Sequence, residues 1–486
     1  MSLKQKTVSG FFWSSIERFS VQGIQFVVQL IMARILLPGE YGLIGIAAIF
    51  LTISRTFIDS GFSNALIRKQ NRTEVDFSTV FYFNIIVGLF FYFLLFFTSP
   101  YIARFFDALV LESLIKVLAL NIIINSLIVV QRAKLTVNID FKTQTKASLL
   151  AVIVSGIIGI GMAYKGFGVW ALAVQSIIGA AIVMVILWTY SRWRPQKVFS
   201  MSSFKEMFSF GSKLLISSLI DSIYTNMYTF VIGKKFSTTD LGYYTRADGF
   251  AQFPSSNLTS VLQRVTFPVL SSIQSDDEIM KDTYRRFLRL SAFVVFPLMI
   301  GLLAVADPLI RLLLTDKWAN VILLLQILCL SQMWYPIHSI NTNLLQVKGR
   351  SDLFLRIEII KKVIGVAILC VTLPIGVAAM CWGMVASSLI ALFINTYYTG
   401  KMIQVGYLTQ MKDLLPILGY SFSMGLIVWG ITHLIHNYIL ALLVGITVGI
   451  SYYFFVARMT KSQELKEIKS LFDMQKEKIR LWKIRK

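Results

Sequence analysis

The feature that most constrains this chain is the recurrence of apolar stretches long enough to cross a bilayer. Of its 486 residues 56% are hydrophobic and only 15% are charged, which excludes an ordinary soluble protein. A helix needs about 20 apolar residues to cross the ~30 Å hydrocarbon core. About fourteen spans are predicted, at residues 11–36, 41–67, 77–98, 110–131, 147–164, 168–190, 208–233, 247–270, 287–306, 318–343, 354–373, 377–399, 413–432 and 438–457.

The charge of the chain is strongly positive, and its distribution explains why. The net charge is +22, and Lys and Arg gather in alternate loops and in the tail from Arg458 onward. This is the positive-inside pattern, which predicts an even number of spans with both termini in the cytoplasm. Nucleic acid is therefore the weaker interpretation. The tail is either a solvated topogenic helix or a binder of anionic headgroups.

Short motifs argue against several other classes of protein. Glu17 and Arg18 interrupt the first apolar stretch, so it is predicted to be a retained span and not a signal peptide. Cys329, Cys370 and Cys381 lack CxxC spacing, so neither a disulfide nor a metal site is expected. The sequence has no P-loop or catalytic triad, so we expect no enzyme activity and no cofactor. All predicted outward loops are short, which argues against a membrane-bound polymerase.

A weak repeat at an offset of 200 residues predicts two lobes. Arg34, Glu40, Gly42 and Phe50 correspond to Lys234, Asp240, Gly242 and Phe250. Parallel repeats of this kind place a substrate site between two halves related by an axis along the membrane normal. The predicted fold is an all-α polytopic membrane protein with two six-helix lobes, at residues 1–200 and 201–402. Two further helices (403–457) and a basic cytoplasmic tail (458–486) follow.

Polar residues inside the spans recur at helical spacing and supply the candidate site. Such stripes either bond neighbouring helices together or line a hydrated cavity. The long stripes that contain charges favour the cavity. The candidates for substrate binding are Arg18, Gln22, Gln25, Arg55, Asp59, Asn121, Asn125, Asp221, Tyr224 and Gln252.

The charged candidates indicate the chemistry of the substrate. Guanidinium groups bind phosphate through paired hydrogen bonds, so arginines in a cavity suit an anionic substrate. Arg55 and Asp59 are one turn apart, however, and the alternative is that they neutralise each other. Acids in the same cavity could bind Na⁺ or exchange protons. The sequence does not choose between these ions.

Four segments of the first 280 residues resemble a known superfamily. Residues 33–42 (ARILLPGEYG) are similar to a turn of the multidrug/oligosaccharidyl-lipid/polysaccharide (MOP) exporters. Residues 59–67 (DSGFSNALI) resemble a signature of its Wzx and WzxC-like branch. Residues 244–247 (YTRA) and 267–271 (FPVLS) resemble two further segments of that branch.

The resemblance implies a flippase that moves an undecaprenyl-pyrophosphate-linked oligosaccharide across the bacterial inner membrane by alternating access, coupled to a cation gradient. It implies a role in making O-antigen, capsule or exopolysaccharide, with a polysaccharide polymerase and chain-length machinery as partners besides membrane lipids. The alternatives are a drug or small-cation antiporter of the same superfamily, or a membrane-bound glycan polymerase. In such flippases the cavity is cationic, and Arg18 and Arg55 are the matching candidates here.

Overall fold

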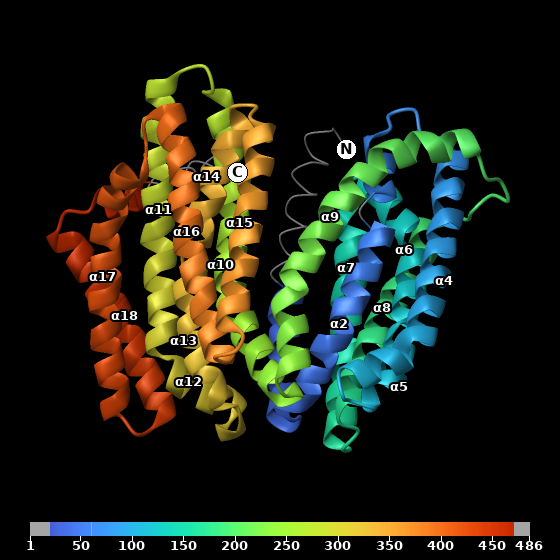
Figure 1. Cartoon of the computed structure of the whole chain (residues 1–486), viewed down its shortest axis with the longest axis horizontal. Coiled ribbons are helices and arrows are strands. Elements are labelled where there is room, and N and C mark those ends of the chain that lie inside the picture. Colours follow the sequence, from blue (N-terminus) through green and yellow to red (C-terminus); the bar gives the residue numbers. More distant parts are fainter. Residues whose placement is uncertain (1–19, 60, 471–486) are drawn as a thin grey trace, which may run out of the picture. The chain divides into compact units, whose positions relative to one another are not determined.

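The computed structural model describes residues 20–59 and 61–470, without the side chains of Asp59 and Phe210. The chain divides into two compact units, Met1–Thr245 and Arg246–Lys486. Within each unit, long helices run side by side and alternate in direction, because most connections between them are short (Figure 1). All regular structure in the described ranges is helical.

The first unit is built from α2 to α9 and the first turns of α10. Its strongest packing joins α7 to α8, α4 to α6 and α6 to α8, followed by α2 to α9. Two short helices interrupt the alternation, since α3 continues α2 beyond a break at Gly61 and α5 meets α6 at Ala119. The elements are a first helical segment Ser20–Ile35, α2 (Pro38–Asp59), α3 (Phe62–Arg68), α4 (Glu74–Phe105), α5 (Val110–Leu118), α6 (Leu120–Val137), α7 (Phe141–Tyr164), α8 (Val169–Ser191), α9 (Met201–Lys235) and α10 (Thr238–Ser272).

The second unit contains the rest of α10 and all later helices. Here α11 packs most closely on α17, and α17 on α18. A short helical segment at residues 463–470 follows α18. The elements are α11 (Asp277–Ala304), α12 (Ala306–Leu314), the 3₁₀ turn η1 (Asp316–Trp318), α13 (Asn320–Gln332), α14 (Tyr335–Val347), α15 (Ser351–Thr372), α16 (Val377–Ile403), α17 (Tyr407–Leu434) and α18 (Tyr438–Met459).

Ten helices of the described chain are long and apolar enough to cross a membrane, so the protein is a multi-pass α-helical membrane protein. They match ten of the predicted spans. The other four predictions lie on the segment Ser20–Ile35, on α9, on α10 and on α15. The polar residues along α9 and α10 lower their hydropathy, although each has 35 residues and is about 52 Å long at 1.5 Å per residue. The count of fourteen spans stays a prediction.

The division into units differs from the predicted lobe boundary at residue 200. The compact first unit extends to Thr245 and includes all of α9. The reason is physical contact: a methyl group at Gly61 would lie 2.8 Å from the backbone oxygen of Gly211, and one at Gly233 would lie 3.0 Å from Ile46. Helix α9 is therefore packed on α2 over much of its length. The lobes defined by the sequence repeat stay a prediction.

The repeated turn has equivalent hydrogen bonds in both copies. Before α2, the backbone N–H of Leu37 donates to the Glu40 carboxylate at 2.7 Å. Before α10, the backbone N–H of Ser237 donates to the Asp240 carboxylate at 3.3 Å, and the Asp240 N–H donates back to the Ser237 hydroxyl at 3.0 Å. Acids at this position satisfy N–H groups that a helix start leaves without a partner. The residues matched by the 200-residue offset thus have the same role.

The repeated glycines have a second shared role, at a crossing of α2 and α10. A methyl group on Gly42 would lie 1.8 Å from the carbonyl oxygen of Thr238. A methyl group on Gly242 would lie 1.9 Å from the carbonyl oxygen of Pro38. Each glycine thus meets the residue four positions before the other glycine. The crossing is reciprocal, and the two backbones touch because neither glycine has a side chain.

This crossing predicts the effect of adding one methyl group. Gly42→Ala or Gly242→Ala should force the two helices apart and lower the free energy of unfolding by about 1–3 kcal/mol or more. The measurement is the melting temperature of each purified variant in detergent. Gly249→Ala is the matched control, since no atom lies within 4 Å of its added methyl group and alanine is the better helix former. A Gly42→Ala variant as stable as the wild type would contradict the tight crossing.

Candidate functional site

The first part of the candidate site lies on the adjacent helices α2 and α9. Arg55 is half-buried on α2, whereas Asp221 is exposed on α9. The heights of these two residues along the helix axes can be compared from the close contact between Gly61 and Gly211. Arg55 lies roughly 9 Å along its helix from that contact and Asp221 roughly 15 Å along its own. The structure therefore places an arginine and an aspartate within about one helical turn of the same level on adjacent helices.

Three other candidates lie on α9 and on the segment Ser20–Ile35. Tyr224 follows Asp221 by three residues on α9 and is half-buried. On the segment Ser20–Ile35, Gln22 is half-buried and Gln25 is exposed. Arg18 lies outside the described residues, as does the side chain of Asp59, so the predicted Arg55–Asp59 pairing stays a prediction.

The two asparagine candidates have contacts inside the first unit. Asn121 is fully buried and donates to the Ser176 hydroxyl of α8 at 3.4 Å. Asn125 donates to the backbone oxygen of Asn121 at 2.6 Å. These bonds join α6 to α8 and α6 to itself, as expected of polar residues that bond helices together in a membrane.

A basic cluster lies at the end of the first unit where α3, α4 and α9 meet the loops. Lys69 binds the carboxylates of Glu206 at 2.9 Å and Asp76 at 3.1 Å. These carboxylates, Glu206 first, raise the pKa of Lys69 above its ordinary value although partial desolvation opposes them. A pocket of about 430 Å³ beside this cluster includes Arg68. Because its lysine is neutralised by two acids, the cluster is foremost an anchor between the loop and α9.

Gln252, the last candidate, is exposed on α10 in the second unit. One turn before it stands Asp248, which the sequence analysis passed over. Asp248 lies only one residue inside the predicted span 247–270. In the structure α10 begins at Thr238, which puts Asp248 about 15 Å from the helix start. The Ser-x-x-Asp capping signature at Ser237 and Asp240 could have revealed the earlier start.

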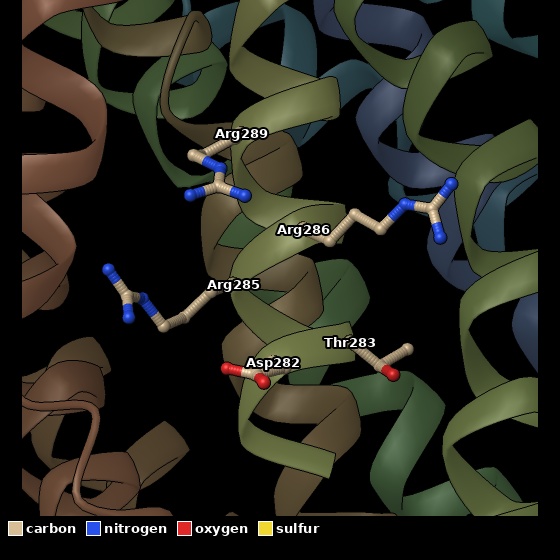
Figure 2. A pocket seen from close by; sticks show the side chains of 5 residues that line it. All are labelled: Asp282, Thr283, Arg285, Arg286 and Arg289. Atoms are coloured by element: carbon tan, nitrogen blue, oxygen red, sulfur yellow. The ribbon is translucent and has the colours of Figure 1, made fainter. Parts of the chain in front are cut away.

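A pocket of about 320 Å³ in the second unit is lined by three arginines of α11, together with Asp282 and Thr283. Arg285 and Arg286 point to opposite sides of the helix, and Arg289 lies one turn from Arg285 (Figure 2). The sequence analysis missed all three: Arg285 and Arg286 precede the predicted span 287–306, and Arg289 lies in its first turn, whereas α11 already starts at Asp277.

Each of these arginines is bound to a carboxylate. Arg285 forms two 2.7 Å hydrogen bonds with Asp413 of α17, whose side chain is only 8% exposed. Two further ion pairs reach the segment after α18, from Arg286 to Glu467 at 2.7 Å and from Arg289 to Glu464 at 3.3 Å. The cluster fastens α17 and residues 463–470 to α11.

Buried amides and hydroxyls bond the other helices of the second unit together. Gln410 of α17 donates at 3.1 Å to both Asn341 of α14 and Thr399 of α16. His338 of α14 lies 3.0 Å from the Ser388 hydroxyl. Within the described residues, no group of three or more His, Cys, Asp or Glu is placed to hold a metal ion.

The alternating helices, the tight helix crossings and the charged residues on α2 and α9 define a polytopic membrane protein with the architecture of a transporter. Residues 31–323 match the family described as "Polysaccharide biosynthesis protein". The chain belongs to that family.

Two curated relatives align with most of the chain. The "Teichuronic acid biosynthesis protein TuaB" of Bacillus subtilis (strain 168) is 24% identical over 89% of this chain and 90% of its own length. The "Lipopolysaccharide biosynthesis protein WzxC" of Escherichia coli (strain K12) is 26% identical over 87% of this chain and 84% of its own length.

Two solved structures share the fold. The lipid II flippase MurJ in an inward closed conformation superposes with a TM-score of 0.75 at 15% identity, over 92% of this chain and 99% of its own. An inward-facing multidrug resistance transporter of the MATE family and MOP superfamily superposes with a TM-score of 0.61 at 16% identity, over 80% of this chain and 98% of its own. The predicted resemblance to WzxC-like polysaccharide proteins is confirmed by the family match and the relatives, and the polytopic helical fold by the solved structures.

The arginine cluster on α11 predicts that Asp413 contributes more to the free energy of unfolding than the surface residue Asp352. Asp413→Ala would remove the bidentate partner of Arg285, whose own side chain is 31% exposed, and should cost about 1.5–3 kcal/mol of unfolding free energy. Asp352→Ala removes the partner of Arg350 on the surface, where both side chains are at least half exposed, and should cost less than about 1 kcal/mol. Chemical denaturation of the two purified variants measures both costs. Equal effects would contradict the assignment of Asp413 as the anchor of α17.

Proposed function

We propose that this protein is a flippase that moves an undecaprenyl-pyrophosphate-linked oligosaccharide from the cytoplasmic to the outer face of the bacterial inner membrane. It would thereby supply a surface polysaccharide, and its partners would include a polymerase and chain-length machinery. The single observation that carries the proposal is near full-length similarity to proteins named for polysaccharide biosynthesis. A third relative, of Rhizobium meliloti (strain 1021), is named a succinoglycan biosynthesis transport protein.

The fold supports transport over synthesis. Its likeness to a lipid II flippase concerns the architecture of the whole chain, and that architecture serves a molecule with a lipid tail and a polar head. The likeness to a MATE transporter makes a drug or small-cation antiporter the second candidate. A flippase changes no covalent bond, so the site needs groups that bind phosphate and sugar and no catalytic residue.

The charged helices α2 and α9 give the proposed site its chemistry. Moving a pyrophosphate through a membrane requires cationic groups to replace its hydration. Arg55 is such a group at membrane depth, and amides such as Gln22 and Gln252 can bond sugar hydroxyls. Asp221 lies at a similar height on the neighbouring helix. Its carboxylate would bind the Arg55 guanidinium when no phosphate is bound. Transport would proceed by alternating access and be coupled to a cation gradient.

The flippase proposal predicts that Arg55→Ala weakens export. Loss of a hydrogen bond to a charged group costs about 1.5–3 kcal/mol, or roughly 10–150-fold in binding. Surface polysaccharide in a strain that depends on this protein, together with its level in the membrane, measures export and insertion separately. Arg18→Ala should act in the same direction.

Arg350→Ala is the control, since Arg350 is exposed and pairs with Asp352 two residues away. Wild-type export by both the Arg18 and Arg55 variants would remove these arginines from the site. If the purified protein converted a lipid-linked oligosaccharide into a longer glycan, the protein would be a polymerase and the flippase proposal would be wrong.

The topology is tested separately by labelling single cysteines from outside the cell. Arg72→Cys and Lys142→Cys should resist an impermeant thiol reagent, because the positive-inside pattern places their loops in the cytoplasm. Lys165→Cys lies exposed in the loop between α7 and α8 and should react. The exposed native Cys370 is first replaced by Ser in all three variants. Labelling of Arg72→Cys and Lys142→Cys with protection of Lys165→Cys would invert the proposed orientation.

A further inference from the structure

The carboxylates that bind the arginines of α11 hold them with unequal strength. Arg285 forms two hydrogen bonds with Asp413, whose side chain is only 8% exposed. Arg286 forms one hydrogen bond, from its Nε to Glu467, and the Arg286 side chain is 51% exposed. Exposed ion pairs of this kind contribute little to stability. The first contact is therefore an anchor, whereas the second can be exchanged for another anion.

Arg289 is held still more loosely. It forms ion pairs with Glu464 at 3.3 Å and with Asp413 at 4.0 Å, and no hydrogen bond within the described part of the chain. A guanidinium carries five N–H donors, and the Arg289 side chain is 24% exposed. A ligand with several acceptor oxygens would use these donors better than the single contact with Glu464 does.

The pocket beside these arginines is formed by one face of α11. The spacing i, i+3, i+4 and i+7, typical of one helix face, is that of its charged residues Asp282, Arg285, Arg286 and Arg289. Arg285 and Arg286 diverge to the two sides, and Arg289 lies between them in the view of Figure 2. The space of about 320 Å³ that they line is therefore surrounded by guanidinium groups, which recognise phosphate oxygens.

The pocket lies where α11 becomes apolar. Residues 290–304 carry no charge, and Arg side chains at the end of such a stretch reach the headgroups of the bilayer. Val294 is 43% exposed and stands eight residues after Arg286, on the same stripe of the helix. An apolar surface thus continues beyond the pocket. A molecule with an anionic head and acyl chains matches both surfaces.

We propose that Arg286 and Arg289 bind the phosphate groups of anionic phospholipid headgroups in exchange for the two glutamates of residues 463–470. Those glutamates, Glu464 and Glu467, are three residues apart on their segment, as the two arginines are on α11. Side chains with this spacing are neighbours on a helix. The segment is therefore an internal ligand whose charges match the site.

The charge of the pocket favours an anionic headgroup once that segment has left. The three arginines then face only the carboxylates of Asp282 and Asp413, so one positive charge is unbalanced. Phosphatidylglycerol has a net negative charge, whereas the phosphate of phosphatidylcholine is balanced by its own ammonium group. Basic pockets at the cytoplasmic ends of membrane helices suit anionic headgroups, and the positive-inside pattern predicts that this end of α11 is cytoplasmic.

Native mass spectrometry of the purified full-length protein measures lipid binding directly. The wild type should retain phosphatidylglycerol in preference to phosphatidylcholine. Arg286→Gln combined with Arg289→Gln should weaken phosphatidylglycerol binding roughly 10-fold or more, because hydrogen bonds to a charged group are lost. Arg350→Gln is the control, since Arg350 is half exposed and pairs with Asp352, and it should bind the lipid like the wild type. Wild-type binding by the double variant would overturn the proposal.

A variant with the opposite expected effect keeps the proposal testable if the arginine variant does not fold. Glu464→Gln combined with Glu467→Gln removes the competing carboxylates and should strengthen phosphatidylglycerol binding, whereas Asp352→Asn should not. Unchanged or weaker binding by the glutamate variant would contradict the exchange.

Inorganic phosphate distinguishes a lipid site from a site for free phosphate. At the concentration of the lipid it should leave phosphatidylglycerol bound, because it has no acyl chains for the apolar surface of α11. Displacement of the lipid by inorganic phosphate alone would show that the pocket binds free phosphate, and the lipid assignment would be wrong. None of these measurements requires transport, so the lipid site and the flippase proposal stand or fail separately.

Discussion

The reciprocal crossing of α2 and α10 is the constraint on which the rest of the first unit depends. Gly42 and Gly242 each leave room for the other helix's backbone, at separations no side chain would allow. The crossing lies near the start of both helices. It therefore sets the directions in which α2 and α10 continue from that point. Helix α9, whose Gly233 packs on Ile46, is held against α2 by the same arrangement. The level of Arg55 relative to Asp221 follows from this packing.

The second unit is held together by a different kind of interaction. Here arginines of α11 bind carboxylates of α17 and of residues 463–470, and Gln410 joins three further helices. Such bonds are favourable because a polar group without a partner is costly in an apolar environment.

The sequence predicted the class of fold, the repeated turn and the family, because hydropathy and short motifs report on them directly. It could not tell whether Asn121 and Gln22 bond to a neighbouring helix or line a cavity, because an amide side chain can do either. It also missed Arg285, which precedes the predicted span 287–306. The first turns of long membrane helices are polar because they meet water and headgroups, so hydropathy begins each span too late. Caps such as Asp276, which accepts from the N–H of Ile279 at 3.0 Å, mark the true start of α11.

The two copies of the repeat share a scaffold but differ in charge. The caps Glu40 and Asp240 and the glycines Gly42 and Gly242 correspond one to one. Arg55, however, corresponds to Ser255, and Asp248 corresponds to Ala48. The cation at this position therefore occurs only in the first copy of the repeat, and the acid only in the second. Because the shared scaffold carries different charges on α2 and α10, we expect the phosphate of the substrate to bind beside the first copy and not beside the second.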